Sequence, residues 1–412
     1  MRGLGRNLIA VALGAVAAAA CLVVASAAGL TPRRAAPTAR VVAEDVRAPL
    51  ARIAIHYAPA ADDVAMPVWR QLFAALPARV EVEVAVARTT DFARFQALLD
   101  AAGIGDRARF HPVIVGHELT TWSRDRFVAL TERDGGGAVL APPRIEVGAA
   151  GRAGDMAAPD ALARAVWDRP ARRTPFAFEG GDLAASARTL FVGAEVLVRS
   201  RGRGAFDRAS VDRALRRSIA GDIVWLGDQP GDVPHHHVMM YMVPLDDREV
   251  LVGDPAAGAA LAAREPAAAA LALDADQAGH QRRFDHVAAL LAARGLRVRR
   301  IPVVVLADAG SYVTYTNALF DREPGPRGRP IVYLPTYRLP DDRMGIVGAS
   351  ARRSPDDRMG IVGASARPTI GWGSSEPPPD DRPTIGWGSS EPPPARRSDG
   401  DRRSLRPTIA RR

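Results

Sequence analysis

Three short polar clusters in this sequence carry residue types that could bind or transform a charged ligand. They are Trp122-Ser123-Arg124-Asp125, Glu179-Gly180-Gly181-Asp182 and His235-His236-His237. Carboxylates bind cations, and histidine can move protons near neutral pH. No nucleophile accompanies the clusters, because the only cysteine is Cys21, inside an apolar N-terminal segment. The residue types therefore predict ligand binding more directly than covalent catalysis.

The first cluster lies between two strand-like segments, Val113–Val115 and Phe127–Thr131, so we expect it on a loop or a strand end. There Asp125 could accept two parallel N–H bonds from a planar guanidinium group. Arg124 could hold this aspartate or a carboxylate of the substrate. A surface Arg–Asp pair beside a buried Trp122 is the alternative interpretation, and it is the more common arrangement.

The second cluster predicts a tight turn ahead of a strand. Gly180 and Gly181 allow a close backbone approach and positive φ, and the turn would present the carboxylates of Glu179 and Asp182. An ordinary turn without a ligand would have the same residues. The combination of this turn with the other two clusters favours a binding site.

The third cluster leads into an alternating stretch, Val238–Val243, which predicts a strand with His235 and His237 on one face. His237 has the chemistry of a general acid and base at neutral pH, although a structural hydrogen bond would explain it equally well. The histidines are poor metal ligands, because no cysteine, helical His-x-x-x-His pair or suitably spaced carboxylate accompanies them. We therefore expect no metal and no other cofactor.

Short strands and helices alternate through residues 52–338, which predicts a layered α/β domain. The expected strands are Arg52–Tyr57, Val80–Val86, Val113–Val115, Phe127–Thr131, Thr189–Val192, Ile223–Leu226, Val238–Val243, Val250–Val252, Val303–Leu306 and Ile331–Leu334. The expected helices are Val68–Leu76, Phe92–Leu99, Pro159–Trp167, Phe206–Ile219 and His280–Arg294.

The N-terminal segment has the features of an export signal. Two arginines precede an apolar run at 8–30, and Ala25-Ser26-Ala27 has the small-x-small form that signal peptidase accepts. Residues 1–30 are predicted to be a signal peptide or an uncleaved membrane anchor, and 31–51 a linker rich in Pro, Ala and Arg. We expect an exported protein that is periplasmic, extracellular or anchored to the outer face of the membrane.

The C-terminal end, 339–412, contains two near-perfect duplications. One begins at Pro340 and again at Pro355, and the other begins at Arg367 and again at Arg382. A Pro-, Gly- and Arg-rich segment without apolar periodicity predicts a disordered tail. It could also carry short linear motifs, or translate repetitive DNA after a loss of the reading frame near Tyr337.

The charge of the chain argues against a nucleic-acid partner. Residues 1–52 carry seven arginines against two acidic residues, and 340–412 carry thirteen against ten, so the central region contributes about +1 of the net charge of +9. The high isoelectric point therefore describes the two ends and not the foldable region.

In order and spacing, the clusters resemble motifs of the guanidino-group-modifying superfamily with the five-bladed pentein fold. The closest likeness is to its agmatine deiminase and bacterial peptidyl-arginine deiminase branch. Trp122, Arg124 and Asp125 match its Trp-x-Arg-Asp motif, and Glu179-Gly180-Gly181-Asp182 matches its Glu-Gly-Gly-Asn/Asp motif. The likeness covers residues 52–337, roughly four of five blades, and the repeats begin where the family's cysteine-bearing blade should stand.

The match to the family's His-x-Asp motif is partial. His237 takes the place of the histidine, but Met239 stands where the second carboxylate is expected. The resemblance implies a pentein-type α/β propeller of repeated strand–helix units, here incomplete, in an exported deiminase-like hydrolase of guanidinium C–N bonds. In that family a cysteine thiolate attacks the guanidinium carbon, a histidine shuttles the proton and two carboxylates bind the substrate.

With neither the cysteine nor the second carboxylate, the chain is expected to be inactive. The resemblance then assigns substrate binding to the residues of the first two motifs, a general acid and base to His237, and no nucleophile. The expected partner is a guanidino small molecule or an arginine side chain, and membrane anchoring could occur through 8–30. The alternative is a non-catalytic guanidinium-binding module, and the last option is an α/β hydrolase or nuclease with a metal at the histidines.

Overall fold

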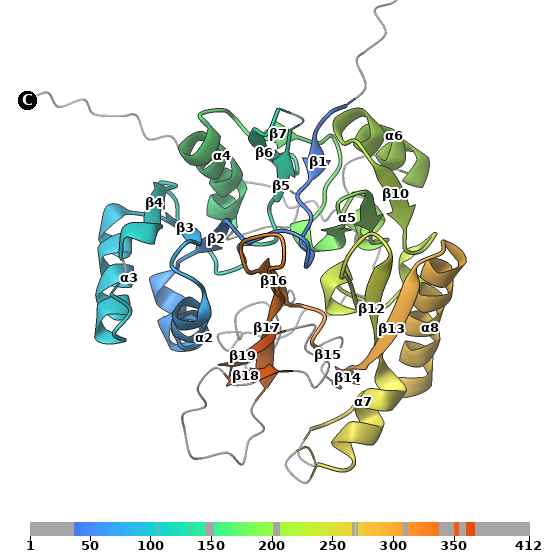
Figure 1. Ribbon diagram of the computed structural model, residues 1–412. Helices are drawn as coiled ribbons and strands as arrows, with labels where there is room; N and C mark the ends of the chain where they lie inside the picture. The colour runs from blue at the N-terminus through green and yellow to red at the C-terminus, as the bar shows by residue number, and fades with distance from the viewer. Residues whose placement is uncertain are drawn as a thin grey trace, which may run out of the picture. The chain divides into compact units, whose positions relative to one another are not determined.

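The computed structural model describes residues 37–105, 107–132, 134–144, 152–200, 207–265, 268, 271–307, 312–337, 350–353 and 360–366. The predicted leader at 1–30, Cys21 and most of the predicted tail lie outside these residues. Within the described chain, no helix combines the length and the apolar character needed to cross a bilayer. The strands form several small sheets accompanied by helices (Figure 1).

The first sheet contains three parallel strands, β2 (Arg52–His56), β3 (Glu81–Val86) and β4 (Phe110–Ile114). Parallel neighbours need a crossover connection, and α2 (Asp62–Ala75) and α3 (Thr89–Ala101) supply the two crossovers (Figure 1). The apolar pattern predicted all five of these elements, although α2 and β4 begin earlier than expected.

Aromatic rings fill the core of this first unit. The ring centroids of Phe73 and Phe110 lie 5.1 Å apart, and those of Phe95 and Phe110 lie 5.7 Å apart, both edge to face. This geometry suits the charge distribution of aromatic rings and adds to the burial of their apolar area. These rings belong to a hydrophobic core that Tyr333, from much later in the chain, also joins.

The second sheet has the order β1 (Arg40–Val41), β5 (Val128–Thr131), β6 (Gly137–Ala141) and β7 (Arg172–Arg173), with α4 (Ala153–Trp167) between β6 and β7. The place of β1 corrects the predicted linker at 31–51. β1 pairs with β5, and Ala39 and Val41 are buried. Composition did not reveal this role, because a two-residue strand gives no periodicity.

The third and fourth sheets repeat one pattern. The third contains β8 (Leu183–Ala185), β9 (Thr189–Val192) and β10 (Asp222–Trp225), with helices α5 (Glu195–Ser200) and α6 (Arg208–Ser218). The fourth contains β11 (Met242–Pro244), β12 (Glu249–Asp254) and β13 (Arg297–Pro302), with helices α7 (Pro255–Ala262) and α8 (Gln277–Ala293).

The pairing within these sheets shows the repeated unit. In each, two antiparallel strands are followed by helices and then by a third strand parallel to the second. The strands β5, β6 and β7 of the second sheet follow the same rule. A right-handed crossover through a helix is the usual way to add such a parallel strand. The predicted series of strand–helix units is therefore present as a mixed α/β fold.

The remaining strands lie near the end of the foldable region. They are β14 (Val304–Val305), β15 (Tyr312–Val313), β16 (Leu319–Arg322), β17 (Pro330–Tyr337), β18 (Ser350–Arg353) and β19 (Gly360–Ala366). β17 pairs antiparallel with β16 and parallel with β19, and β18 pairs with β19. β18 and β19 lie within the segment that the sequence predicts to be a disordered tail, and they are joined to the sheet of β16 and β17.

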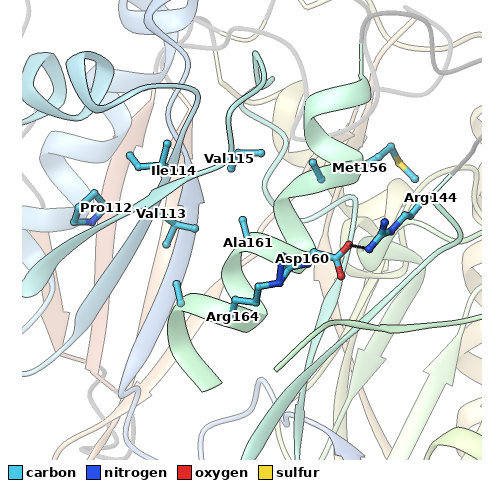
Figure 2. Close-up of a pocket in the computed structure, with 11 residues that line it drawn as sticks. Pro112, Val113, Ile114, Val115, Arg144, Met156, Asp160, Ala161 and Arg164 are labelled. Atoms are coloured by element: carbon cyan, nitrogen blue, oxygen red, sulfur yellow. Dashed lines mark ion pairs between the residues drawn. The ribbon is translucent and has the colours of Figure 1, made fainter. Parts of the chain in front are cut away.

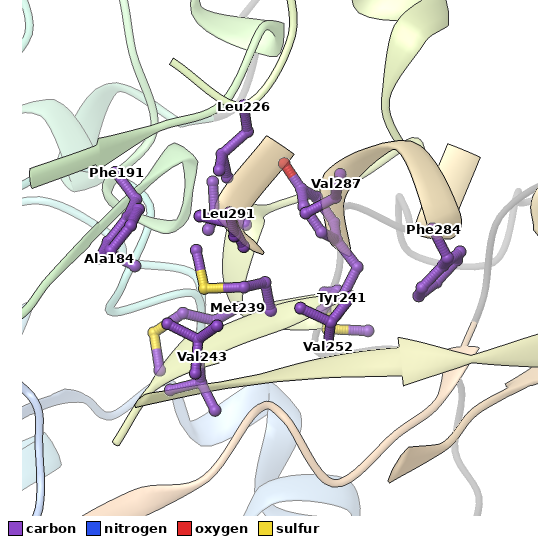
Figure 3. Packing of buried hydrophobic residues seen from close by; sticks show 14 of the residues in the cluster. Ala184, Phe191, Leu226, Met239, Tyr241, Val243, Val252, Phe284, Val287 and Leu291 are labelled. Carbon is purple, nitrogen blue, oxygen red and sulfur yellow. The ribbon is translucent and has the colours of Figure 1, made fainter. Parts of the chain in front are cut away.

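A hydrophobic cluster between the third and fourth sheets contains Met239, Tyr241, Val243 and Phe284 (Figure 3). The predicted strand Val238–Val243 is wrong in its first half, because Val238–Met240 form the short 3-10 helix η6 and only then does β11 begin. All six of these side chains are buried, whereas an alternating strand with one solvated face would expose every second one.

Candidate functional site

Asp125 lies in the loop between β4 and β5, in a turn closed by a hydrogen bond from its N–H to the carbonyl of Trp122 (3.2 Å). The turn is tied to the first sheet because the N–H of His56 donates to Ser123 Oγ (2.9 Å). Asp125 is buried, with only 2% of the residue exposed to solvent. The predicted loop is confirmed, and Asp125 is not part of a surface pair.

The Glu179–Asp182 segment forms the predicted tight turn, with the 3-10 helix η3 at Gly180–Asp182. Asp182 Oδ2 accepts from the N–H of Glu179 (2.8 Å), and the N–H of Gly180 donates to the carbonyl of Asp125 (2.9 Å). A Cβ at Gly180 would lie 2.1 Å from the carbonyl oxygen of Arg124. Glycine is therefore required where the two motifs touch.

His237 immediately precedes η6 and points into the same region. Its Nε2 lies 2.8 Å from Glu179 Oε2, and a Cβ at Gly181 would lie 2.3 Å from its ring. His236 has φ of +103°, a strained backbone for a residue with a side chain. The side chain of His235 is 59% exposed, whereas that of His237 is 7% exposed, so the two do not share a face.

The three predicted motifs converge on one buried cluster. One ligating atom from each of Asp125, Glu179 and His237 lies within 4.8 Å of the other two. These residues come from three separate connections of the fold, after β4, before β8 and before β11. The tertiary structure thus brings together carboxylates and a histidine that the sequence separates widely.

Neither a protein-family model nor a curated protein matches this sequence. Solved structures do match its fold. The agmatine deiminase of C. jejuni is 13% identical with a TM-score of 0.52, and a substrate-bound variant of it is 14% identical with a TM-score of 0.54. Each alignment covers 79% of this chain and 90% of the other.

A protein from Porphyromonas gingivalis, assigned as an arginine deiminase, is 15% identical with a TM-score of 0.51 over 79% of this chain and 93% of its own. The fold is that of the agmatine deiminases. The predicted likeness to agmatine and arginine deiminases is therefore confirmed at the level of the fold.

The other residues that the sequence assigned to the site make contacts that hold the fold together. The guanidinium of Arg124 lies 2.5 Å from Glu44 and donates to the carbonyl of Leu183 (3.1 Å), so it links the N-terminal segment to β8. Asp182 closes its own turn and pairs with Arg199 (2.9 Å). Trp122 is half-buried beside the loop. The predicted binding roles of these three residues stay predictions.

Sequence reasoning missed three arginines that surround the cluster. Arg152 lies 2.7 Å from Asp125, Arg199 lies 2.7 Å from Glu179, and Arg126 lies 3.8 Å from Glu179. Arg126 is itself 2% exposed. Only Arg126, next to Asp125 in the chain, offered a local signal, because the other two reach the site through the tertiary fold.

The charges around Glu179 and His237 favour an ion pair. Burial alone would raise the pKa of Glu179, but the hydrogen bond with His237 and the charges of Arg199, His237 and Arg126 outweigh it and lower the pKa to about 2. Burial alone would lower the pKa of His237, but Glu179 together with Asp182 and Asp125 raises it above its ordinary value. The pair is therefore ionised over a broad pH range.

Asp125 is held less firmly as an anion. Burial, and then the charge of Glu179, raise its pKa, although His237 and Arg152 act in the opposite direction. Desolvation penalises the charged form of a buried carboxylate, and here this penalty and the repulsion of Glu179 together exceed the attraction of His237 and Arg152. Of the two carboxylates in the cluster, the ionised form of Asp125 is therefore the less stabilised by the charges around it.

The same three ligating atoms could in principle surround a metal ion, since they lie within 4.8 Å of one another. The arginines decide against it, because Arg152, Arg199 and Arg126 already bring positive charge to these carboxylates. A divalent cation would meet this repulsion in a buried place where charges are weakly screened. The donor set fits a guanidinium better than a metal.

Met239 is buried in a cluster of apolar side chains. It is 6% exposed and packs in the hydrophobic cluster with Phe191, Leu226 and Val243 (Figure 3). The resemblance places a carboxylate at this position, and a carboxylate among these side chains would lose hydration without gaining partners. The packing around Met239 therefore favours an apolar side chain over the carboxylate that the resemblance implies at this position.

A separate surface cavity of about 590 Å³ lies between β4 and α4 (Figure 2). Its lining includes Val113, Met156 and Arg164, together with the ion pair between Arg144 and Asp160 (3.0 Å). Asp125, Glu179 and His237 are not among its lining residues. The cavity thus lies apart from the polar cluster.

Proposed function

We propose that this chain is an exported protein of the deiminase fold that binds a guanidino compound or an arginine side chain through Asp125 and Glu179, without hydrolysing it. One observation carries the proposal. A guanidinium, that of Arg152, lies 2.7 Å from Asp125 and 3.5 Å from Glu179. The spacing of the two carboxylates thus suits a planar, doubly hydrogen-bonding cation.

The proposed lack of turnover follows from the chemistry of the guanidinium carbon. Resonance makes this carbon a poor electrophile, and the related family attacks it with a thiolate. The sequence has a single cysteine, Cys21, in the predicted leader, and Met239 replaces the expected second carboxylate. Loss of the covalent step alone should cost many powers of ten in rate.

Export is part of the proposal and depends on the leader sequence. The apolar run at 8–30 and Ala25-Ser26-Ala27 support cleavage by signal peptidase. The N-terminal sequence of the protein recovered outside the cytoplasm would test it. A start soon after Ala27 is expected, an intact leader in membranes would indicate the anchor, and recovery only from the cytoplasm would contradict export.

Calorimetric titration with agmatine and with an arginine-containing peptide tests binding, and ammonia release from agmatine tests turnover. We expect saturable binding to the wild type, none to Asp125→Asn, and no ammonia from either. Asp160→Asn is the matched control, because Asp160 is also a buried acidic residue paired with arginine but lines the other cavity. Sustained ammonia release would contradict the non-catalytic proposal.

An inactive remnant without ligand binding is the second candidate. The arginines of the cluster favour it, because the carboxylates of Asp125 and Glu179 are each already paired with an arginine of the protein itself. Titrations in which neither ligand saturates any form of the protein would support this candidate.

A further inference from the structure

Arg152 stands at the N-terminal end of α4, and its side chain reaches into the polar cluster. Its Nη2 lies 2.7 Å from Asp125 Oδ2, its Nε 2.9 Å from Asp155 Oδ2, and its Nη1 3.5 Å from Glu179 Oε1. One guanidinium thus directs three of its nitrogens toward three carboxylates. This is how a planar cation with five N–H donors satisfies several acceptors at once.

The position of Arg152 coincides with that of the proposed ligand. Asp125 and Glu179 are the carboxylates to which the proposed function assigns an external guanidinium, and Arg152 already donates toward both. Two guanidinium groups cannot make the same short contacts with Asp125 Oδ2. An external guanidinium that uses Asp125 Oδ2 and Glu179 Oε1 is therefore an alternative to Arg152 at this site.

A charge count leads to the same result. Four buried carboxylates belong to Asp125, Asp155, Glu179 and Asp182. The positive groups in contact with them are the guanidiniums of Arg126, Arg152 and Arg199 and the imidazole of His237, whose pKa is raised. Among the described residues that make these contacts, four charges of each sign balance. A fifth cation would stay uncompensated in a poorly screened interior unless one cation left.

We propose that Arg152 is an internal substitute for the guanidino ligand, so that an external guanidinium binds only when the Arg152 side chain leaves Asp125 and Glu179. This inference rests on the proposed function, because it concerns the same carboxylates. It adds a regulatory contact: binding by this protein is limited by competition from its own chain.

The surroundings of Arg152 allow such a departure. Its side chain is 20% exposed, in contrast to 2% for that of Arg126. Asp155, the third partner, keeps two hydrogen bonds from Thr120, one from its N–H (2.8 Å) and one from its hydroxyl (2.6 Å). Glu179 keeps His237 and Arg199. When the Arg152 side chain leaves, the carboxylate of Asp125 is therefore the one that chiefly becomes available to a new partner.

The test compares agmatine binding by the wild type, Arg152→Gln and Arg173→Gln in calorimetric titrations. Arg173 is the matched control, because its side chain is 18% exposed and it pairs with Asp160 at 2.6 Å outside the cluster. We expect at least tenfold tighter binding to Arg152→Gln and unchanged binding to Arg173→Gln. If Arg152→Gln does not fold, Arg152→Lys keeps the charge without the planar fork, and a severalfold gain is expected.

A second readout uses the guanidinium ion itself at millimolar concentration. It should raise the Tm of Arg152→Gln by occupying the place of the lost side chain, and should leave the Tm of Arg173→Gln unchanged. Binding to Arg152→Gln that equals or falls below that of the wild type would overturn the inference and leave the proposed function standing. Absence of agmatine binding in every form would overturn the proposed function, and this inference with it.

Discussion

His237 and Met239 are two residues apart, yet they belong to regions that are held by different forces. His237 joins the polar cluster, where each contact is directional and links residues distant in the sequence, such as Glu179 at 2.8 Å. Met239 joins the hydrophobic cluster, which is held by removal of apolar surface from water (Figure 3). A change of side-chain charge should therefore destabilise either region. A change of side-chain shape should destabilise the hydrophobic cluster less than the polar cluster.

This contrast also explains how a ligand site and a core can be adjacent. The polar cluster keeps buried charges by pairing every one of them, and such pairing is sensitive to the loss of a single partner. The hydrophobic cluster has no partner to lose. Its side chains can adjust to a substitution of similar volume.

The largest effect is expected from Glu179→Gln. This change removes the charge that meets Arg199, Arg152 and His237, and leaves buried cations without a counter-ion. We expect a loss of about 3–5 kcal/mol in the free energy of unfolding, measured by denaturant titration. Glu118→Gln is the control, because Glu118 pairs with Arg88 at the exposed surface and should cost about 0–1 kcal/mol. Equal losses would contradict the contrast.

Met239→Asp tests the hydrophobic region and restores the carboxylate expected from the resemblance. A carboxylate would be buried among apolar side chains, so we expect the free energy of unfolding to fall by about 3 kcal/mol. Met239→Leu should cost less than about 1.5 kcal/mol. Thermal unfolding of both variants measures the difference, and a neutral Met239→Asp would show that this residue faces the polar cluster instead.

Gly180→Ala tests the junction of the first two motifs. The new Cβ would meet the carbonyl oxygens of Arg124 at 2.1 Å and Phe127 at 2.3 Å, and backbone must shift to admit it. We expect a loss of about 2 kcal/mol in denaturant titrations. Gly231→Ala is the control, because nothing lies within 4 Å of a Cβ there. A destabilisation no larger than that of the control would show that the junction is loose.

The smallest effect is the pH dependence of the ion pair between Glu179 and His237. The pKa of His237 is raised in the folded protein, so its contribution is complete below about 6.5 and is lost as the pH rises through the folded pKa. The loss is about 1.4 kcal/mol for each unit by which the pKa is raised. Denaturation measured from pH 5 to 9 should show this decline in the wild type and not in His237→Gln.

At acid pH the same pair behaves in the opposite sense. Because the pKa of Glu179 is lowered to about 2, its stabilisation is present above about 4.5 and is lost as the pH falls toward 2. The pair therefore stabilises the fold most between these two ranges. A wild-type profile that keeps rising above pH 7 would contradict the assignment of His237 as the charged partner.

Much of the local structure could be predicted from periodicity. Strands such as Glu81–Val86 and helices such as Gln277–Ala293 lie where apolar spacing placed them, because that spacing depends only on residues close in the chain. Prediction failed at β1, whose two residues carry no period, and at Val238–Met240, where a turn buries successive side chains. In both places tertiary contacts decide the conformation.

The sequence by itself determined the alternation of strands and helices, the glycines of the Glu179–Asp182 turn and the residue types available for a site. Only the tertiary structure decided which charges share one buried space. Arg152 lies 27 residues from both Asp125 and Glu179, and no local pattern marks it as their partner. Burial sets the strength of such contacts, and burial is a property of the folded chain.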